Sequence, residues 1–177
     1  VMIDFLLKKR EGIKNNLPIV GPVNENYWAF GDSYNKGAWV LHTLRNVINN
    51  DDLWFSILKN FAIDNAKAHV STETFLNYII RATRENYQLV FYQYFYDHRP
   101  PTFEYYQEGE KFYYRWSNVV SGFAMPLDID LNGVEKRLEV TKELSTLSIS
   151  EHSVIHIRDW ESLVITKRNP DLKELIN

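Results

Sequence analysis

The chain has 177 residues, 45% of them hydrophobic and 15% aromatic, so it can fill a core as one domain or as two small ones. Its net charge of −3 lacks the basic excess that nucleic-acid binding needs, and no apolar run approaches the roughly 20 residues of a membrane-spanning helix. The sequence contains no cysteine, which excludes disulfides, thiolate nucleophiles and cysteine-based zinc sites.

The first hundred residues carry hydrophobic side chains at helical spacing. Pro100 and Pro101 end the last helix, since proline lacks the N–H donor and disfavours helical backbone in the residue before it. Five helices are expected. The first ends before residues 14–16, and the second is capped by Asp32 or Ser33. The third begins at Asn50 or Asp51, the fourth begins at Ser71 or Thr72, and the fifth runs from Leu89 to about Asp97.

The same spacing indicates which faces of these helices turn to the core. Ala38, Leu41, Leu44 and Ile48 recur every three or four residues, which predicts a buried stripe on the second helix. Aromatic residues are dense between residues 87 and 116, and we interpret them as a hydrophobic seam between helices and sheet in preference to a carbohydrate platform. The third and fourth helices are expected to bury Leu53, Trp54, Ile57, Leu58 and Phe61, then Phe75, Tyr78, Ile79 and Ala82.

After the two prolines the hydrophobic period falls to two, as in half-buried strands. Asn132-Gly133 is a strong signal for a two-residue hairpin turn because both residues tolerate positive φ, and Glu108-Gly109 is a weaker one. Short strands at this spacing suggest a small antiparallel β-sandwich. We therefore expect an α+β fold, with a helical part at residues 1–100 and a β-sandwich domain at residues 101–177.

Histidines and acidic residues are the first candidates for metal ligands or catalytic groups. His152 and His156 are four residues apart in a strand-like segment, so about 13 Å would separate them, too far for one metal ion. The sequence has no H-E-x-x-H motif, and we expect surface or packing roles for both and a boundary position for His42. Asp128 and Asp130 alternate with hydrophobic residues, as on a solvated strand face.

Tyr34 is expected on the first turn of the second helix, just after a loop that contains Gly31. A phenol at this position would project from the helix end into a neighbouring cleft. Packing is nevertheless the commoner role of a tyrosine at a helix start, so the residues alone leave both roles open.

The stretch Gly31-Asp32-Ser33-Tyr34-Asn35-Lys36-Gly37-Ala38 resembles the Tyr-x-Lys-Gly-Ala helix of the aminopeptidase N family of zinc metallopeptidases. Residues 17–22 are similar to the family's loop before that helix, and residues 70–75 to its Thr-x-x-Phe helix start. Residues 91–105 resemble its last helix running into the next domain, and residues 113–126 extend the resemblance into the following β-domain. Each piece has low specificity, but their order and spacing cover nearly the whole chain.

This resemblance implies the helical C-terminal subdomain of a thermolysin-like catalytic domain, followed by a β-sandwich. In the family, zinc is held by H-E-x-x-H and a later glutamate, and Gly-x-Met-Glu-Asn recognises the free amine of the substrate. Those motifs lie upstream of the tyrosine helix, and none occurs in this chain. The family's tyrosine at the position of Tyr34 donates a hydrogen bond to the oxyanion formed when water attacks the scissile carbonyl.

The chain is thus expected to be the C-terminal portion of a zinc-dependent aminopeptidase, with Tyr34 as its catalytic residue and no zinc ligand of its own. Its partners would be the peptide substrate and the upstream zinc-binding part of the same protein. The alternative is a non-catalytic protein- or peptide-binding module on the same scaffold. The compartment stays open, a periplasmic or other extracytoplasmic location included.

The start of the chain at Val1, inside an expected helix, suggests a fragment. Helices that normally pack on the zinc-binding part would then expose apolar surface. Self-association through that face is the expected consequence, and the portion alone is predicted to be inactive.

Overall fold

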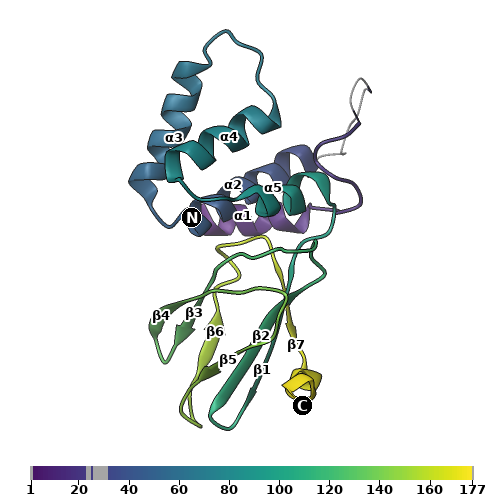
Figure 1. The fold of residues 1–177 in the computed structure, drawn as a ribbon, viewed down its shortest axis with the longest axis vertical. Helices are drawn as coiled ribbons and strands as arrows, with labels where there is room; N and C mark the ends of the chain where they lie inside the picture. The colour runs from purple at the N-terminus through teal and green to yellow at the C-terminus, as the bar shows by residue number, and fades with distance from the viewer. Residues whose placement is uncertain (1, 23–24, 26–31, 177) are drawn as a thin grey trace.

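The computed structural model describes residues 2–22, 25 and 32–176, and its α-helices precede its strands (Figure 1). The change falls at Pro100–Pro101, and only a 3-10 helix follows the last described strand. The α+β fold class is therefore confirmed. The helical elements are α1 (Met2–Glu11), α2 (Asp32–Ile48), α3 (Asp51–Asp64), α4 (Thr72–Thr83), α5 (Gln88–Phe91) and the π-helical turn η1 (Tyr92–Tyr96). The later elements are β1 (Thr102–Glu108), β2 (Lys111–Ser117), β3 (Leu127–Leu131), β4 (Val134–Leu138), β5 (Ser145–Ser148), β6 (Ile155–Ile157), β7 (Ile165–Arg168) and the 3-10 helix η2 (Pro170–Ile176).

Two of the predicted helix starts are set by local capping. The side chain of Asn50 accepts a hydrogen bond from the N–H of Leu53 at 2.9 Å and begins α3. Ser71 begins α4 through a reciprocal capping box with Thr74. Both predictions are confirmed, because a cap depends only on residues within one turn of it.

The fifth helix differs from a regular α-helix. It starts as α5 and widens into η1, where the N–H of Asp97 donates to the carbonyl of Tyr92 at 3.1 Å, five residues back. Within this turn Tyr92 is 52% exposed, whereas Tyr94 is fully buried. The carbonyl of Phe95 accepts from the N–H of Val20 at 3.0 Å, so the loop after α1 is attached to this turn.

In the described part of the chain the strands form two sheets, in the orders β5-β2-β1-β7 and β4-β3-β6. The Asn132-Gly133 turn joins β3 and β4 as predicted, with both residues at positive φ. The predicted antiparallel arrangement is wrong for one pair, since β7 runs parallel to β1. Both strands start at the helical layer, because β1 follows η1 and β7 follows a loop, residues 158–164, that contacts α2.

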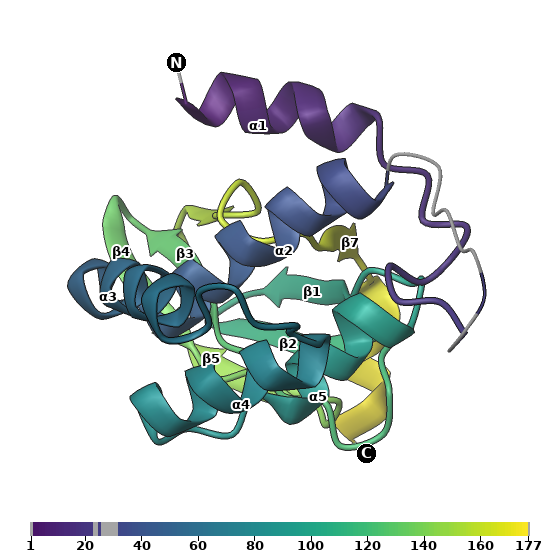
Figure 2. The ribbon, with the colours of Figure 1, turned by 90° about the horizontal axis from the view of Figure 1, so that it is seen from above.

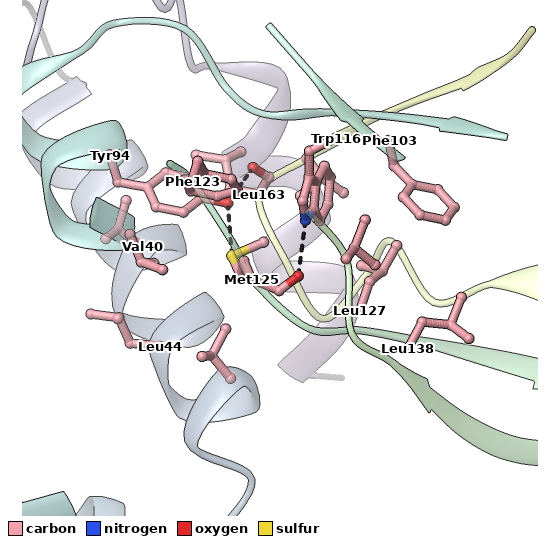
Figure 3. Packing of buried hydrophobic residues seen from close by; sticks show 14 of the residues in the cluster. Val40, Leu44, Tyr94, Phe103, Trp116, Phe123, Met125, Leu127, Leu138 and Leu163 are labelled. Atoms are coloured by element: carbon pink, nitrogen blue, oxygen red, sulfur yellow. Dashed lines mark hydrogen bonds between the residues drawn. The ribbon is translucent and has the colours of Figure 1, made fainter. Parts of the chain in front are cut away.

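One hydrophobic core continues from the helices into both sheets. Tyr94 of η1 donates to the carbonyl of Leu163 at 3.0 Å and lies 3.8 Å from the sulfur of Met125, while the indole of Trp116 donates to the carbonyl of Met125 at 2.9 Å (Figure 3). The dense aromatic segment is therefore a packing seam, as interpreted from the sequence. Because the core crosses residue 100, the division into two domains there stays a prediction.

The strands also hold α2 at its C-terminal end. Arg137 of β4 donates to the last-turn carbonyls of Asn46 and Val47 and pairs with both carboxylate oxygens of Asp128 at 3.0 Å. A guanidinium suits the negative end of the helix dipole. The expectation that Asp128 lies on a solvated face is wrong, because the Asp128 side chain is buried beneath this pair. Asp130 is half-buried and lies 3.4 Å from Arg158.

Replacing Arg137 by methionine should lower the free energy of unfolding by about 1–3 kcal/mol, because it leaves the Asp128 carboxylate buried without its partner and uncaps α2. Urea denaturation of the variant measures this change. Arg168→Met is the matched control, since the exposed Arg168 lies over the Tyr106 ring and its removal should cost less than about 1 kcal/mol. Equal losses in the two variants would contradict the role given to Arg137.

Candidate functional site

Tyr34 lies on the first turn of α2, with its side chain 77% exposed. Seen from above, α2 runs between α1 and α5 in the helical layer (Figure 2). The Tyr34 side chain borders an open, mainly apolar groove. The groove is lined by Ile19, Ser33, Tyr34, Gly37, Ala38, Leu41, Phe61, Phe75 and Phe95.

Three of the residues that line this groove are phenylalanines from separate elements. Phe61 of α3 meets Phe75 of α4 edge to face, with ring centroids 5.0 Å apart. Phe95 of η1 stacks on the buried Phe91 at 5.0 Å. Phe61 and Phe75 were predicted to be buried, but they are only half-buried because one side of each ring borders the groove.

The predicted buried stripe of α2 is wrong at two positions. Ala38 and Leu41 are exposed along the groove, whereas Leu44 is fully buried. The face of α2 that turns to the core is instead formed by Lys36, Trp39, Val40, Thr43, Leu44 and Val47. Apolar side chains are exposed along the groove, while the packing of an upstream part on this surface and self-association through it stay predictions.

Buried polar contacts hold the first turn of α2 in place. Asp32 or Ser33 was predicted to cap the helix, and both lie within α2 as described. The carboxylate of Asp32 accepts from the backbone N–H groups of Lys14 and Asn15 at 2.9 and 2.8 Å. Lys36 has no exposed surface, and its ammonium donates to the carbonyl of His98 at 2.9 Å. Gly31, the start of the motif, lies outside the described residues.

Burial disfavours the positive charge of Lys36, and two nearby carboxylates partly offset this effect. Burial lowers the pKa of Lys36, while the negative charges of Asp32 and Asp97 act in the opposite direction. The hydrogen bond from Arg99 holds the pKa of Asp97 below its usual range, so Asp97 stays charged beside this cluster. The sequence reasoning missed Lys36, and its only signal was its place four residues after Asp32, where opposite charges on a helix are neighbours.

The other candidates from the sequence do not join Tyr34. His42 is half-buried against the Trp39 ring, 3.2 Å from the carbonyl of Trp160, and burial lowers the pKa of its imidazole. His152 and His156 are exposed. Among the residues that the structure describes, no three His, Asp or Glu side chains come close enough to hold a metal ion, so these residues do not form a zinc site.

None of the helices in the described ranges is both long and apolar enough to cross a bilayer.

Four of the five segments that carry the family resemblance contribute to the groove, and residues 113–126 do not. The loop at residues 17–22 contributes Ile19, the helix at 31–38 contributes Tyr34, the helix start at 70–75 contributes Phe75, and the segment at 91–105 contributes Phe95. The segments at 17–22 and 31–38 are close in the chain, the other two lie far from them, and the groove is a surface that all four share.

No family model matches the sequence, and no curated protein matches it either. A solved structure does share the fold, the crystal structure of Legionella pneumophila aminopeptidase A in complex with aspartic acid. The TM-score is 0.65 at 17% sequence identity, over 88% of this chain and 21% of that chain. This chain therefore shares its fold with part of that aminopeptidase. The chain spans about a fifth of the length of that aminopeptidase.

Tyr34→Phe should leave the free energy of unfolding unchanged within about 0.5 kcal/mol, because the Tyr34 side chain is 77% exposed. Tyr94→Phe is the matched control, since it removes a buried hydroxyl that donates to the carbonyl of Leu163, and it should cost about 1–2 kcal/mol. Thermal and urea denaturation of both variants measure these changes. A large loss in Tyr34→Phe would make Tyr34 a structural residue.

Proposed function

We propose that the chain is the C-terminal portion of a zinc-dependent aminopeptidase that hydrolyses N-terminal residues from peptides. The convergence of four family-like segments on one groove, with an exposed tyrosine at its edge, carries this proposal. The peptidase-related fold supports it. The family assignment itself, to the aminopeptidase N family, is part of the proposal.

Tyr34 is given the role of oxyanion donor. Hydrolysis of an amide develops negative charge on the carbonyl oxygen, and this charge is largest in the transition state. An exposed phenol is free to donate its O–H to that oxygen, and it stabilises the transition state more than the neutral ground-state carbonyl. The anchored first turn of α2 holds the tyrosine in place before the substrate arrives.

The zinc of such an enzyme would be held elsewhere in the parent protein. The described residues do not form a metal site, so we assign no zinc ligand and no step at the metal to them. The apolar groove would receive the upstream part of the catalytic domain and the peptide substrate.

A second candidate is a non-catalytic module that binds a protein or peptide in the same groove. The exposed Ala38, Leu41 and Tyr34 favour it, since an open apolar surface binds a partner without any chemistry. The coding sequence upstream of Val1 separates the two candidates. H-E-x-x-H followed about 20 residues later by a glutamate supports the enzyme, and its absence supports the module.

In the full-length protein, Tyr34→Phe should lower kcat by about 10²–10³-fold, because the hydroxyl acts on the transition state. The zinc content should equal that of the unsubstituted protein, because the hydroxyl does not contact a zinc ligand. Steady-state kinetics on aminoacyl amides and elemental analysis measure both quantities. Tyr92→Phe is the matched control, since Tyr92 is 52% exposed but stacks on Tyr96 away from the groove. An unchanged kcat in Tyr34→Phe removes Tyr34 from the mechanism.

The 177-residue chain alone should show no peptidase activity and no stoichiometric zinc, because its described residues bring no ligand set together. Equilibrium dialysis against zinc followed by elemental analysis is the measurement. One equivalent of zinc, lost on substitution of His42, His152 or His156, would overturn the assignment of the ligands to the upstream part.

A further inference from the structure

We infer that Lys36 is a positioning residue for Tyr34: its buried ammonium fixes the first turn of α2 and thereby the direction of the Tyr34 phenol. This inference rests on the proposed function. The Lys36 side chain does not line the groove, and its role as an anchor would explain why a charged group is buried at the start of α2.

The geometry of the first turn couples the two side chains. Residues two apart on a helix point about 200° apart around its axis, so Tyr34 and Lys36 lie on nearly opposite sides of α2. Accordingly Tyr34 is 77% exposed at the groove, and Lys36 has no exposed surface. Any rotation or fraying of this turn that moves Lys36 therefore moves Tyr34 as well.

The buried ammonium is an energetically costly anchor. Taking a charged amine out of water is unfavourable unless it is hydrogen-bonded and paired. Lys36 reaches the carbonyl of His98 at 2.9 Å and lies in the field of Asp32 and Asp97. A methionine would fill a similar volume without the desolvation cost, so the ammonium is expected to contribute a fixed position more than stability.

The first turn is held from two sides. Asp32 accepts from the N–H groups of Lys14 and Asn15, which lie after α1, and Lys36 donates to His98, which lies after η1. Loss of the ammonium releases the second attachment and removes a positive charge near Asp32. The remainder of α2 keeps its own anchors, so the effect is local to the turn that carries Tyr34.

Thr43 provides an anchor for comparison. Its hydroxyl donates to the carbonyl of Trp39 at 2.8 Å and accepts from the N–H of Leu163 at 2.9 Å. Thr43 is buried as Lys36 is, but it lies in the middle of α2. Thr43→Val therefore lowers stability without releasing the first turn.

The experiment is a double-mutant cycle in the full-length protein with Lys36→Met and Tyr34→Phe. With Tyr34 present, Lys36→Met should lower kcat about 10- to 100-fold with KM changed less than about 3-fold, because small displacements of a catalytic group cost this much. In the Tyr34→Phe background the same substitution should change kcat less than about 3-fold, since the group that it positions is gone. Hydrogen exchange of residues 32–37 should rise in Lys36→Met and stay unchanged in Thr43→Val.

Three results would overturn the inference: an unchanged kcat in Lys36→Met, an equal loss of kcat in both backgrounds, or the same loss in Thr43→Val. An unchanged kcat in Tyr34→Phe alone is a different result, because it removes the proposed function and the inference with it. If Lys36→Met does not fold, Lys36→Leu enters the cycle in its place, since it also removes the N–H donor to the His98 carbonyl. Its kcat must then show the same dependence on Tyr34.

Discussion

Helix α2 is fixed by charged side chains at both ends, and the groove, the tyrosine and the packing of the sheets all depend on its position. At the start of the helix, Asp32 and Lys36 attach it to the segments after α1 and η1. At its end, Arg137 and Asp128 attach it to the second sheet. Charges are an expensive way to hold a helix, but their hydrogen bonds are directional, so they define both its position and its rotation. Apolar contacts alone would allow the helix to slide or turn.

Local rules predicted much of the fold. The caps at Asn50 and Ser71 and the turn at Asn132-Gly133 were correct because each depends on residues within a few positions. Features that depend on distant partners were not predicted. Asp128 alternates with hydrophobic residues as a solvated residue would, and only the arrival of Arg137 from β4 makes its burial possible. The parallel pairing of β7 with β1 likewise depends on the path of the preceding loop across α2.

The candidate site was only partly accessible from the sequence. The residues alone left Tyr34 between a packing and a catalytic role, and only the family resemblance favoured the catalytic one. Lys36 was part of the same motif, but a lysine on a helix is normally solvated, so its burial could not be read from its spacing. A cleft beside Tyr34 was expected, but the residues of α2 that line it were missed for a different reason. Ala38 and Leu41 are spaced like core residues, and periodicity does not distinguish a surface that packs within the chain from one left open.

The π-helical turn η1 makes the groove sensitive to the number of residues in the chain. A π turn holds one more residue than an α turn over the same length, so η1 behaves like an α-helix that has accepted a single insertion. Removal of that residue would restore α-helical geometry and rotate the residues after it by about 100° around the helix axis. Phe95 would then leave the groove wall, and its carbonyl would no longer face Val20. Insertions and deletions in residues 92–96 are therefore far less tolerable here than substitutions, even though several of these side chains are partly exposed.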